Sequence, residues 1–170
     1  MKQLLFFSSA LMISTSSFAQ PGTLDGDFDA DGILFIDPFN NTDLAQDVAQ
    51  TADGKLVVAG YTFNNGDNDW MVKRLHPDGS ADNSFGIAGL VVLDLAAGAD
   101  LCRAMELQDD GKILLAGTTE DNTSSDLTVM RLETNGNMDA TFGTNGMAVV
   151  DVANGSYDLL YDMAFNLTER

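Results

Sequence analysis

Three alternating aspartates lie near the start of the chain: Asp27, Asp29 and Asp31, with Gly32 directly after them. Alternate carboxylates followed by glycine begin many calcium-binding loops, because hard oxygen atoms converge on the ion and the glycine permits a sharp bend. The bidentate glutamate that completes such a loop would fall at Pro38. Two interpretations therefore stay open: a calcium site formed by these three aspartates, or an acidic turn exposed to solvent.

Other residues that could support catalysis are few and isolated. The only histidine, His76, stands at a turn without the partners that acid–base catalysis or zinc binding would need. The only cysteine, Cys102, cannot form an internal disulfide, and we predict a small buried apolar side chain there rather than a reactive thiol. We therefore predict no catalytic residues, no cofactor apart from calcium, and a protein that is not an enzyme.

The composition is that of a folded and strongly acidic protein. The 170 residues are 45% hydrophobic and carry a formal net charge of −18. Of the 26 acidic residues 22 are aspartate, which favours turns, so the negative charge is expected to follow the turns. Such a surface repels phosphate groups, which argues against nucleic acids and anionic membranes as partners and leaves calcium or a basic protein surface.

The first 19 residues have the pattern of a secretory signal peptide. Lys2 supplies a positive charge, an apolar run follows, and small residues lead up to Ala19. The apolar run is too short and too rich in serine to favour a membrane anchor. We expect cleavage after Ala19 and a mature chain that begins at Gln20. We expect this mature protein to be secreted, periplasmic or on the cell surface.

The rest of the chain is a tandem repeat. The octapeptide from Asp53 to Gly60 returns, with conservative changes, from Asp110 to Gly117, so the period is 57 in residue number. Other positions have the same spacing: Asp25, Asp82 and Asp139; Phe28, Phe85 and Phe142; Gly32, Gly89 and Gly146; Asp37, Asp94 and Asp151. A fixed period near this length is typical of propeller blades, so we divide the chain into units 20–78, 79–135 and 136–170.

Each unit is predicted to contain four short antiparallel strands and little helix. The predicted strands are residues 33–36, 45–51, 55–60 and 70–75 in the first unit, residues 90–93, 102–108, 112–117 and 127–132 in the second, and residues 147–150 in the third. The third strand of a unit is a continuous apolar run, typical of a strand covered on both faces. Asp53-Gly54 and Asp110-Gly111 precede it and favour a type I′ hairpin turn. Together these patterns predict an all-β protein of tandem four-stranded blades of β-propeller type.

Two motifs in combination resemble a known repeat family. The octapeptides supply Asp-Gly-Lys, aliphatic residues and Ala-Gly, and the pattern Arg-Leu-x-x-(Asp/Asn)-Gly-x-x-Asp-x-x-Phe-Gly begins at Arg74 and again at Arg131. This combination resembles the delta-60 repeat, a bacterial repeat thought to build β-propellers in exported proteins. The resemblance covers residues 22–167 and implies a propeller-type fold, but it implies no activity that can be assigned to particular residues.

The third unit keeps the register as far as Asp151 and then continues one residue out of step from Asp158. About two and a half units are present, whereas a closed propeller needs roughly four to eight blades. Two expectations follow. Either the sequence is a fragment of a longer propeller, or copies of the chain complete their sheets by self-association.

Residues that recur in the units are most simply structural. The recurring aspartates are predicted to accept backbone N–H groups at turns: Asp25, Asp82 and Asp139. Arg74 and Arg131 are each expected to pair with a recurring aspartate across or between blades. Lys55 and Lys112 follow a turn and are expected to lie in solvent at the start of a strand.

Residues that differ between units are the better candidates for binding. Trp70, Tyr61 and Phe63 flank the polar loop 64–69, where they could form an aromatic patch for a glycan or peptide. Packing between blades accounts for Trp70 equally well, since Leu127 takes its place in the next unit.

The favoured function is therefore a secreted, non-enzymatic structural or interaction scaffold that binds an unknown protein or glycan through loops that differ between units. Two alternatives stay open: part of a propeller enzyme acting on extracellular glycans, and a calcium-dependent adhesion module built on Asp27, Asp29 and Asp31. Fold class alone does not choose among them.

Overall fold

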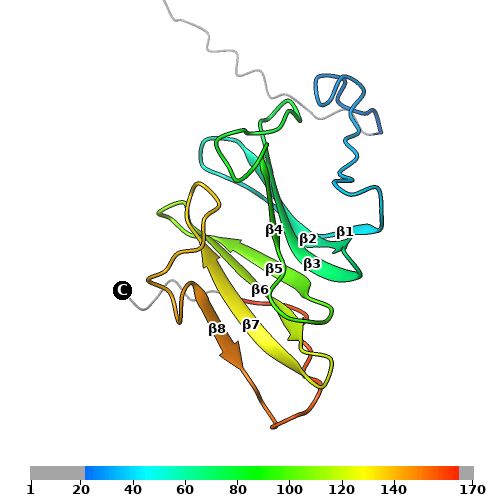
Figure 1. Ribbon diagram of the computed structural model, residues 1–170. Helices are drawn as coiled ribbons and strands as arrows, with labels where there is room; N and C mark the ends of the chain where they lie inside the picture. Colours follow the sequence, from blue (N-terminus) through cyan, green and yellow to red (C-terminus); the bar gives the residue numbers. More distant parts are fainter. Residues whose placement is uncertain (1–21, 165–170) are drawn as a thin grey trace, which may run out of the picture.

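The computed structural model describes residues 22–164, so the predicted signal peptide, residues 1–19, lies outside the described residues. Residues 22–164 form two antiparallel sheets of four strands each and contain no helix, hence none that could cross a membrane (Figure 1). The first sheet contains β1 (Asp43–Gln50), β2 (Leu56–Asn64), β3 (Asp67–Leu75) and β4 (Leu90–Leu93). The second contains β5 (Leu101–Leu107), β6 (Ile113–Glu120), β7 (Ser125–Leu132) and β8 (Met147–Val150). The predicted all-β class with four-stranded antiparallel sheets is confirmed.

The sheets are out of phase with the sequence repeat. Each sheet has its strands in chain order, and the last strand pairs with the third: β3 with β4, and β7 with β8. Because β4 follows residue 79, the first sheet takes its fourth strand from the second sequence unit, and the second sheet likewise takes β8 from the third unit. A sheet is therefore formed by parts of two successive repeats.

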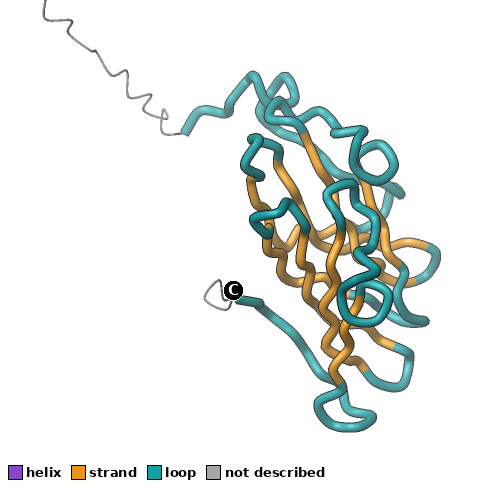
Figure 2. The backbone as a smooth tube through the Cα atoms, turned by 90° about the vertical axis from the view of Figure 1, so that its left-hand side faces the viewer, coloured by secondary structure: helices purple, strands orange, loops and turns teal. Residues whose placement is uncertain are grey.

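Residues 33–36 do not form the predicted strand. They occupy the repeat position of β4 and β8, each of which pairs with a third strand that precedes it in the chain. Within the described residues, no strand precedes residues 33–36, so they have no sheet edge to complete. They run instead as an extended loop beside the first sheet, and the side chain of Phe35 is 86% exposed. At the C-terminal end of the described chain, residues 151–164 follow β8 and form a loop (Figure 2).

The connection between β2 and β3 and the connection between β1 and β2 differ in length and in backbone conformation. Asn65 and Gly66 join β2 to β3, and both have positive φ angles, as a two-residue type I′ turn requires. At Asp53-Gly54 only the glycine has a positive φ, and its N–H donates to the carbonyl oxygen of Thr51. The predicted hairpin is confirmed there, but the predicted type I′ turn is wrong because the connection is longer than two residues.

The hydrophobic core lies between the two sheets, where β5 packs against β1, β2 and β3. The first sheet contributes fully buried Trp70 and Val72, and the second contributes Leu115 and Met130. Almost every residue of β6 is buried, as its apolar run predicts, whereas burial alternates along β2. The prediction of two covered faces is therefore wrong for β2, because the second sheet covers only one face of the first.

Glycine near the middle of β2 and β6 permits a close approach of the neighbouring strand. The ladder between β5 and β6 shifts register between Cys102 and Ala104, and a methyl group on Gly117 would collide with the backbone oxygen of Leu101. The same shift and the same collision occur at Gly60 beside β1. The Ala-Gly end of each octapeptide is thus explained by a bulge in the first strand of each sheet.

Candidate functional site

Asp82 is the centre of a buried cluster of charges. Its Oδ2 accepts a hydrogen bond of 2.7 Å from Nε of Arg74 and lies 3.2 Å from Nζ of Lys55. Its Oδ1 accepts from the backbone N–H and the hydroxyl of Ser84, at 3.0 and 2.6 Å. The predicted capping role of Asp82 and the predicted pairing of Arg74 are both confirmed.

The same cluster recurs in the second sheet around Asp139. Arg131 Nε and Lys112 Nζ each lie 2.7 Å from Oδ2, and Thr141 replaces the serine, its hydroxyl 2.6 Å from Oδ1. The prediction that Lys55 and Lys112 lie free in solvent is wrong. Each lysine directly precedes a strand and reaches the turn that carries the aspartate, a proximity that only the folded chain creates.

Hydrogen bonds from cations stabilise the charged form of both aspartates. Donation by Lys112, together with donation by Thr141 and Arg131, holds the pKa of Asp139 well below its usual range. Burial opposes the charge of Asp82, but hydrogen bonds from Ser84 and Lys55 and the charge of Arg74 outweigh it and keep its pKa low as well. The recurring lysine, arginine and aspartate residues of these two clusters therefore have a structural role.

The aspartates of the predicted calcium loop take part in local turns. Oδ1 of Asp31 accepts the N–H of Ile33 at 2.9 Å, and the N–H of Asp27 donates to Oδ1 of Asp25 at 3.1 Å. The structure does not bring the carboxylates of Asp27, Asp29 and Asp31 to within 4.8 Å of one another. The calcium loop stays a prediction.

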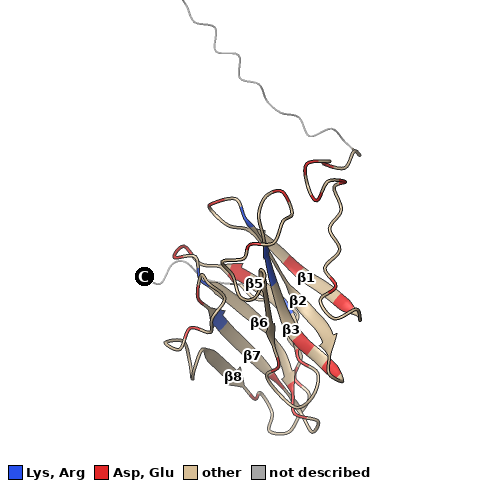
Figure 3. Ribbon diagram, turned by 45° about the horizontal axis from the view of Figure 1, so that its top comes forward, with Lys and Arg blue, Asp and Glu red and all other residues tan. Residues whose placement is uncertain are grey.

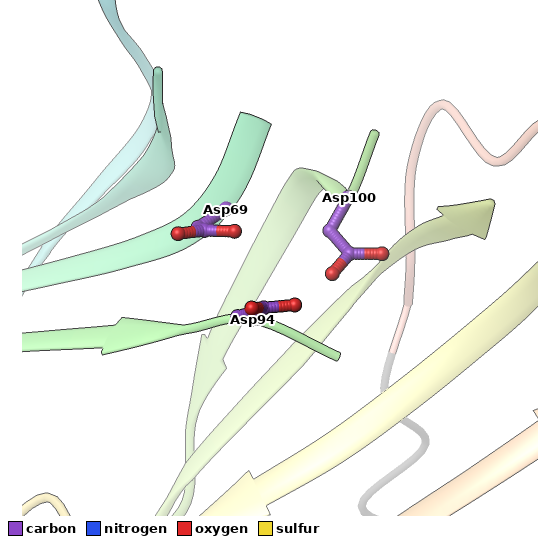
Figure 4. Close-up of side chains that lie close together, drawn as sticks. All are labelled: Asp69, Asp94 and Asp100. Carbon is purple, nitrogen blue, oxygen red and sulfur yellow. The ribbon is translucent and has the colours of Figure 1, made fainter. Parts of the chain in front are cut away.

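Two other groups of three aspartates do converge among residues 22–164. In the first, one carboxylate oxygen from each of Asp69, Asp94 and Asp100 lies within 4.8 Å of the others. Figure 4 shows the three carboxyl groups around a common space: Asp69 on β3, Asp94 just after β4, and Asp100 just before β5. Asp69 and Asp100 are buried and Asp94 is exposed, so the group is accessible from one side.

The buried carboxylates of this group, those of Asp69 and Asp100, have few hydrogen-bond donors to stabilise a negative charge. Oδ2 of Asp100 accepts the backbone N–H groups of Leu95 and Ala96 at 2.6 and 3.1 Å, but within the described chain Oδ1 has no hydrogen-bond partner. Burial raises the pKa of Asp100 to about 6, although the backbone N–H groups of Leu95, Ala96 and Glu120 favour its charged form. Burial also raises the pKa of Asp69, although Asn64 donates a hydrogen bond of 2.8 Å to it.

The second group consists of Asp126, Asp151 and Asp158, which are half-buried or exposed. Asp126 and Asp151 lie one repeat period after Asp69 and Asp94, and Asp158 occupies the position of Asp100 after the one-residue slip. Burial and the neighbouring carboxylates raise the pKa of Asp126. Unlike Asp100, Asp158 uses both oxygens, accepting the N–H of Val152 and the hydroxyl of Ser156 at 2.8 Å each.

The sequence pattern did not indicate that these groups are sites, although part of the signal was present. The repeat spacing between Asp94 and Asp151 identified both as recurring residues, and recurrence suggested scaffold. The same spacing joins Asp69 and Asp126. What the spacing cannot show is that a residue of β3 meets one residue after β4 and another before β5, because that contact depends on the path of the chain between the sheets.

The predicted aromatic patch is not formed by Trp70, which is fully buried between the sheets. Tyr61, which pairs with Trp70 across β2 and β3, lies under the guanidinium of Arg103, whose Cζ is 5.5 Å from the ring centre, and Phe63 is 37% exposed. Cys102 is fully buried, as predicted. His76 is partly exposed, with Nε2 4.0 Å from Oδ1 of Asp82.

A cavity of about 460 Å³ lies between residues 34–38 and the outer part of the first sheet. Phe35, Leu75 and Ile87 give it apolar walls, and Lys73 is its basic residue. Burial lowers the pKa of Lys73, whose Nζ donates to the backbone oxygen of Ala88 at 2.9 Å. The cavity thus combines apolar surface with an amine that is already hydrogen-bonded.

Comparison with protein families supports the architecture. Residues 51–85 and 108–142 each match the family described as a domain of unknown function (DUF5122) beta-propeller. The two matches lie one repeat period apart, and each contains the lysine, arginine and aspartate of one buried charge cluster. These two segments are thus similar to a β-propeller family of unknown function, which supports a propeller-type repeat. A comparison with curated proteins gave no match.

Proposed function

We propose that this chain is an exported repeat protein of the delta-60 kind that acts as a non-enzymatic scaffold, structural or for interaction. The observation that carries this proposal is that both sheets have a cluster of lysine, arginine and aspartate, at Asp82 and at Asp139, while the loops at the other end of the second and third strands differ. Recurring internal contacts with variable loops are what a binding scaffold requires.

Rigid coupling between the sheets supports the proposal. Arg74 of the first sheet donates through Nη1 to the backbone oxygen of Thr134, which follows the last residue of β7 by two positions. Its guanidinium also lies over the ring of Phe85, with Cζ 4.6 Å from the ring centre. One side chain thus connects a buried aspartate, an aromatic ring and the neighbouring sheet, which fixes the relative position of the loops.

The loops that differ lie at the same end of the two sheets. The connection from β2 to β3 is the two-residue turn Asn65-Gly66, whereas residues 121–124 connect β6 to β7. In the longer loop, Oδ1 of Asp121 accepts the N–H groups of Thr123 and Ser124 at 2.9 Å each. We infer that such unit-specific loops carry the binding surface.

The charge of the protein indicates the kind of partner. Figure 3 shows aspartate and glutamate on the turns and strand ends of both sheets, with few lysines or arginines between them. The net charge of −18 disfavours nucleic acids and anionic membranes and favours a basic protein surface or a neutral glycan.

A binding assay combined with a turnover assay tests the scaffold role. The purified protein is immobilised and exposed to a panel of neutral polysaccharides and of basic and acidic polypeptides. We expect saturable binding to a neutral or basic probe, with the probe recovered unchanged. New reducing ends that increase with protein concentration would show a glycan-cleaving enzyme instead, and the absence of binding to every probe would contradict an interaction role.

Export is tested separately. Residues 1–30 are fused to a phosphatase that is active only outside the cytoplasm, and the N-terminus of the secreted chain is sequenced. We expect an active fusion and an N-terminus at Gln20. A chain that keeps Met1 and stays in the cytoplasm would contradict the proposed localisation.

A further inference from the structure

We propose that Asp69, Asp94 and Asp100 bind a calcium ion at the junction between the two sheets. Three oxygens that all lie within 4.8 Å of one another share a point at most about 2.8 Å from each, close to the usual calcium–oxygen distance of about 2.3–2.6 Å. Asp69 lies in β3 of the first sheet, Asp94 directly follows β4 of that sheet, and Asp100 directly precedes β5 of the second. The ion would be a link between the sheets.

The charges around this space are unbalanced. Within residues 22–164, no lysine, arginine or histidine forms an ion pair with any of the three aspartates, whereas Asp82 and Asp139 each have two such partners or more. Three carboxylates without a cation repel one another, and burial of two of them makes the repulsion stronger. A divalent cation would remove this repulsion.

One unpartnered oxygen within this group and another on a neighbour of Asp69 point independently to a ligand. Asp100 is fully buried, and its Oδ1 has no hydrogen-bond partner in the described residues. Thr62, also fully buried, pairs with Asp69 across β2 and β3, so the two side chains share one face of the sheet. In the same part of the chain the hydroxyl of Thr62 is without a partner too. Buried oxygens normally have partners, and a hard cation takes oxygen ligands of these types.

Accessibility fits a site for a hydrated ion. Asp94 is exposed, so water can reach the space and complete the six to eight ligands that calcium takes. Carboxylates and water select calcium or magnesium over softer metals. Because calcium accepts irregular geometry whereas magnesium requires near-octahedral ligands, three side chains on three segments favour calcium.

The second group of aspartates gives an internal comparison. Asp126, Asp151 and Asp158 repeat the arrangement, but both oxygens of Asp158 already accept hydrogen bonds. We expect this group to bind calcium more weakly than the first. The difference provides a control within the same protein.

Calcium titration of the purified, chelator-treated protein tests the site. At about 10 mM calcium we expect the melting temperature to rise by roughly 3–6 °C above that in sodium chloride of equal ionic strength, as binding in the range of 10⁻⁴–10⁻³ M would give. No rise would overturn the proposal.

Two single variants locate the ion. Asp69→Asn and Asp100→Asn each keep a hydrogen-bond acceptor, and each should reduce the calcium-dependent rise to less than about 1 °C. Without calcium both should melt at or above the wild-type temperature, because one of three like charges is removed. An unchanged calcium response in both variants would overturn the proposal.

Two control variants separate this site from the other acidic positions. Asp126→Asn should keep most of the calcium response, and so should the triple variant Asp27→Asn, Asp29→Asn, Asp31→Asn. If the triple variant loses the response and Asp69→Asn keeps it, the ion binds in the N-terminal loop and the proposed junction site is wrong.

Terbium gives a second measurement that does not depend on stability. Tb³⁺ replaces calcium on hard oxygen ligands and emits when an excited indole lies close by. Trp70, the only tryptophan, directly follows Asp69 in β3. We expect luminescence on excitation of Trp70, displacement by calcium, and loss in Asp69→Asn. Luminescence that persists unchanged in Asp69→Asn would place the ion elsewhere.

Discussion

Arg74 and Asp82 form a buried ion pair, with Nε of the arginine 2.7 Å from Oδ2 of the aspartate and both side chains at most 10% exposed. Arg131 and Asp139 repeat this pair at the same distance in the second sheet. In both sheets a lysine from the preceding hairpin joins the aspartate. The repeat is therefore held by a charge cluster as well as by its apolar strands.

Removal of the aspartate should destabilise the protein strongly. We expect Asp82→Asn to lower the free energy of unfolding by about 3 kcal/mol, because it leaves the buried guanidinium of Arg74 without its counter-charge. Urea denaturation measures this. Asp53→Asn is the matched control: Asp53 also contacts Lys55, but its side chain is 62% exposed, so its loss should lower the unfolding free energy much less. Equal losses would contradict a special role for the buried cluster.

The contribution of Asp82 should depend on pH in a defined direction. Its pKa in the folded protein is lowered, so its charged form is stabilised by folding. That stability is fully present above the unfolded pKa of about 3.9 and is lost as the pH falls toward the folded value. The difference in unfolding free energy between wild type and Asp82→Asn should stay constant from about pH 7 to pH 5 and shrink below pH 4. A difference that is unchanged at pH 2 would show that charge is not involved.

Glycine at the bulge should be required for tight packing of the second sheet. A Cβ atom at Gly117 would collide with the backbone of Leu101 and lie 2.8 Å from Cζ2 of Trp70. We expect Gly117→Ala to cost about 2–3 kcal/mol in unfolding free energy. Gly26, which has open space around it, is the control, and Gly26→Ala should change stability by less than about 0.5 kcal/mol. Similar effects would contradict the close approach.

Cys102 should resist thiol reagents in the folded protein. The side chain is fully buried, and burial raises the pKa of its thiol to about 12. At pH 8 we expect its reaction with an aromatic disulfide reagent to be more than about 100-fold slower than in urea, where the thiol is exposed. A fast reaction in the absence of denaturant would show that the region between the sheets opens readily.

The sequence predicted the strands best where neighbours in the chain also pair with one another. The hairpins β2–β3 and β6–β7, and the pairing of Arg74 with an aspartate of the turn that follows β3, come from local patterns. Residues 33–36 have the right composition for a strand, but whether they form one depends on a strand before them to pair with, and within the described residues no strand precedes them. The sequence pattern could not supply that information.

The same dependence on distant segments explains why the sequence pattern did not predict the candidate site. The Asp27 to Asp31 motif was visible because its residues are adjacent, whereas the junction group collects Asp69, Asp94 and Asp100 from three segments. Lys55 was misplaced for a related reason, since its partner Asp82 belongs to the next sequence unit. Recurrence identified which residues matter in the repeat, and only the folded chain shows which of them meet.

The phase difference between sheet and repeat has an evolutionary consequence. Since β4 belongs to the sequence unit after β1, β2 and β3, each unit begins by closing its predecessor's sheet. A gene duplication that inserts one whole period, at any point in the register, would therefore add a complete sheet and leave every existing strand with a proper partner. Arrays of this kind can gain or lose repeats by recombination without passing through a form in which a strand lacks its partner.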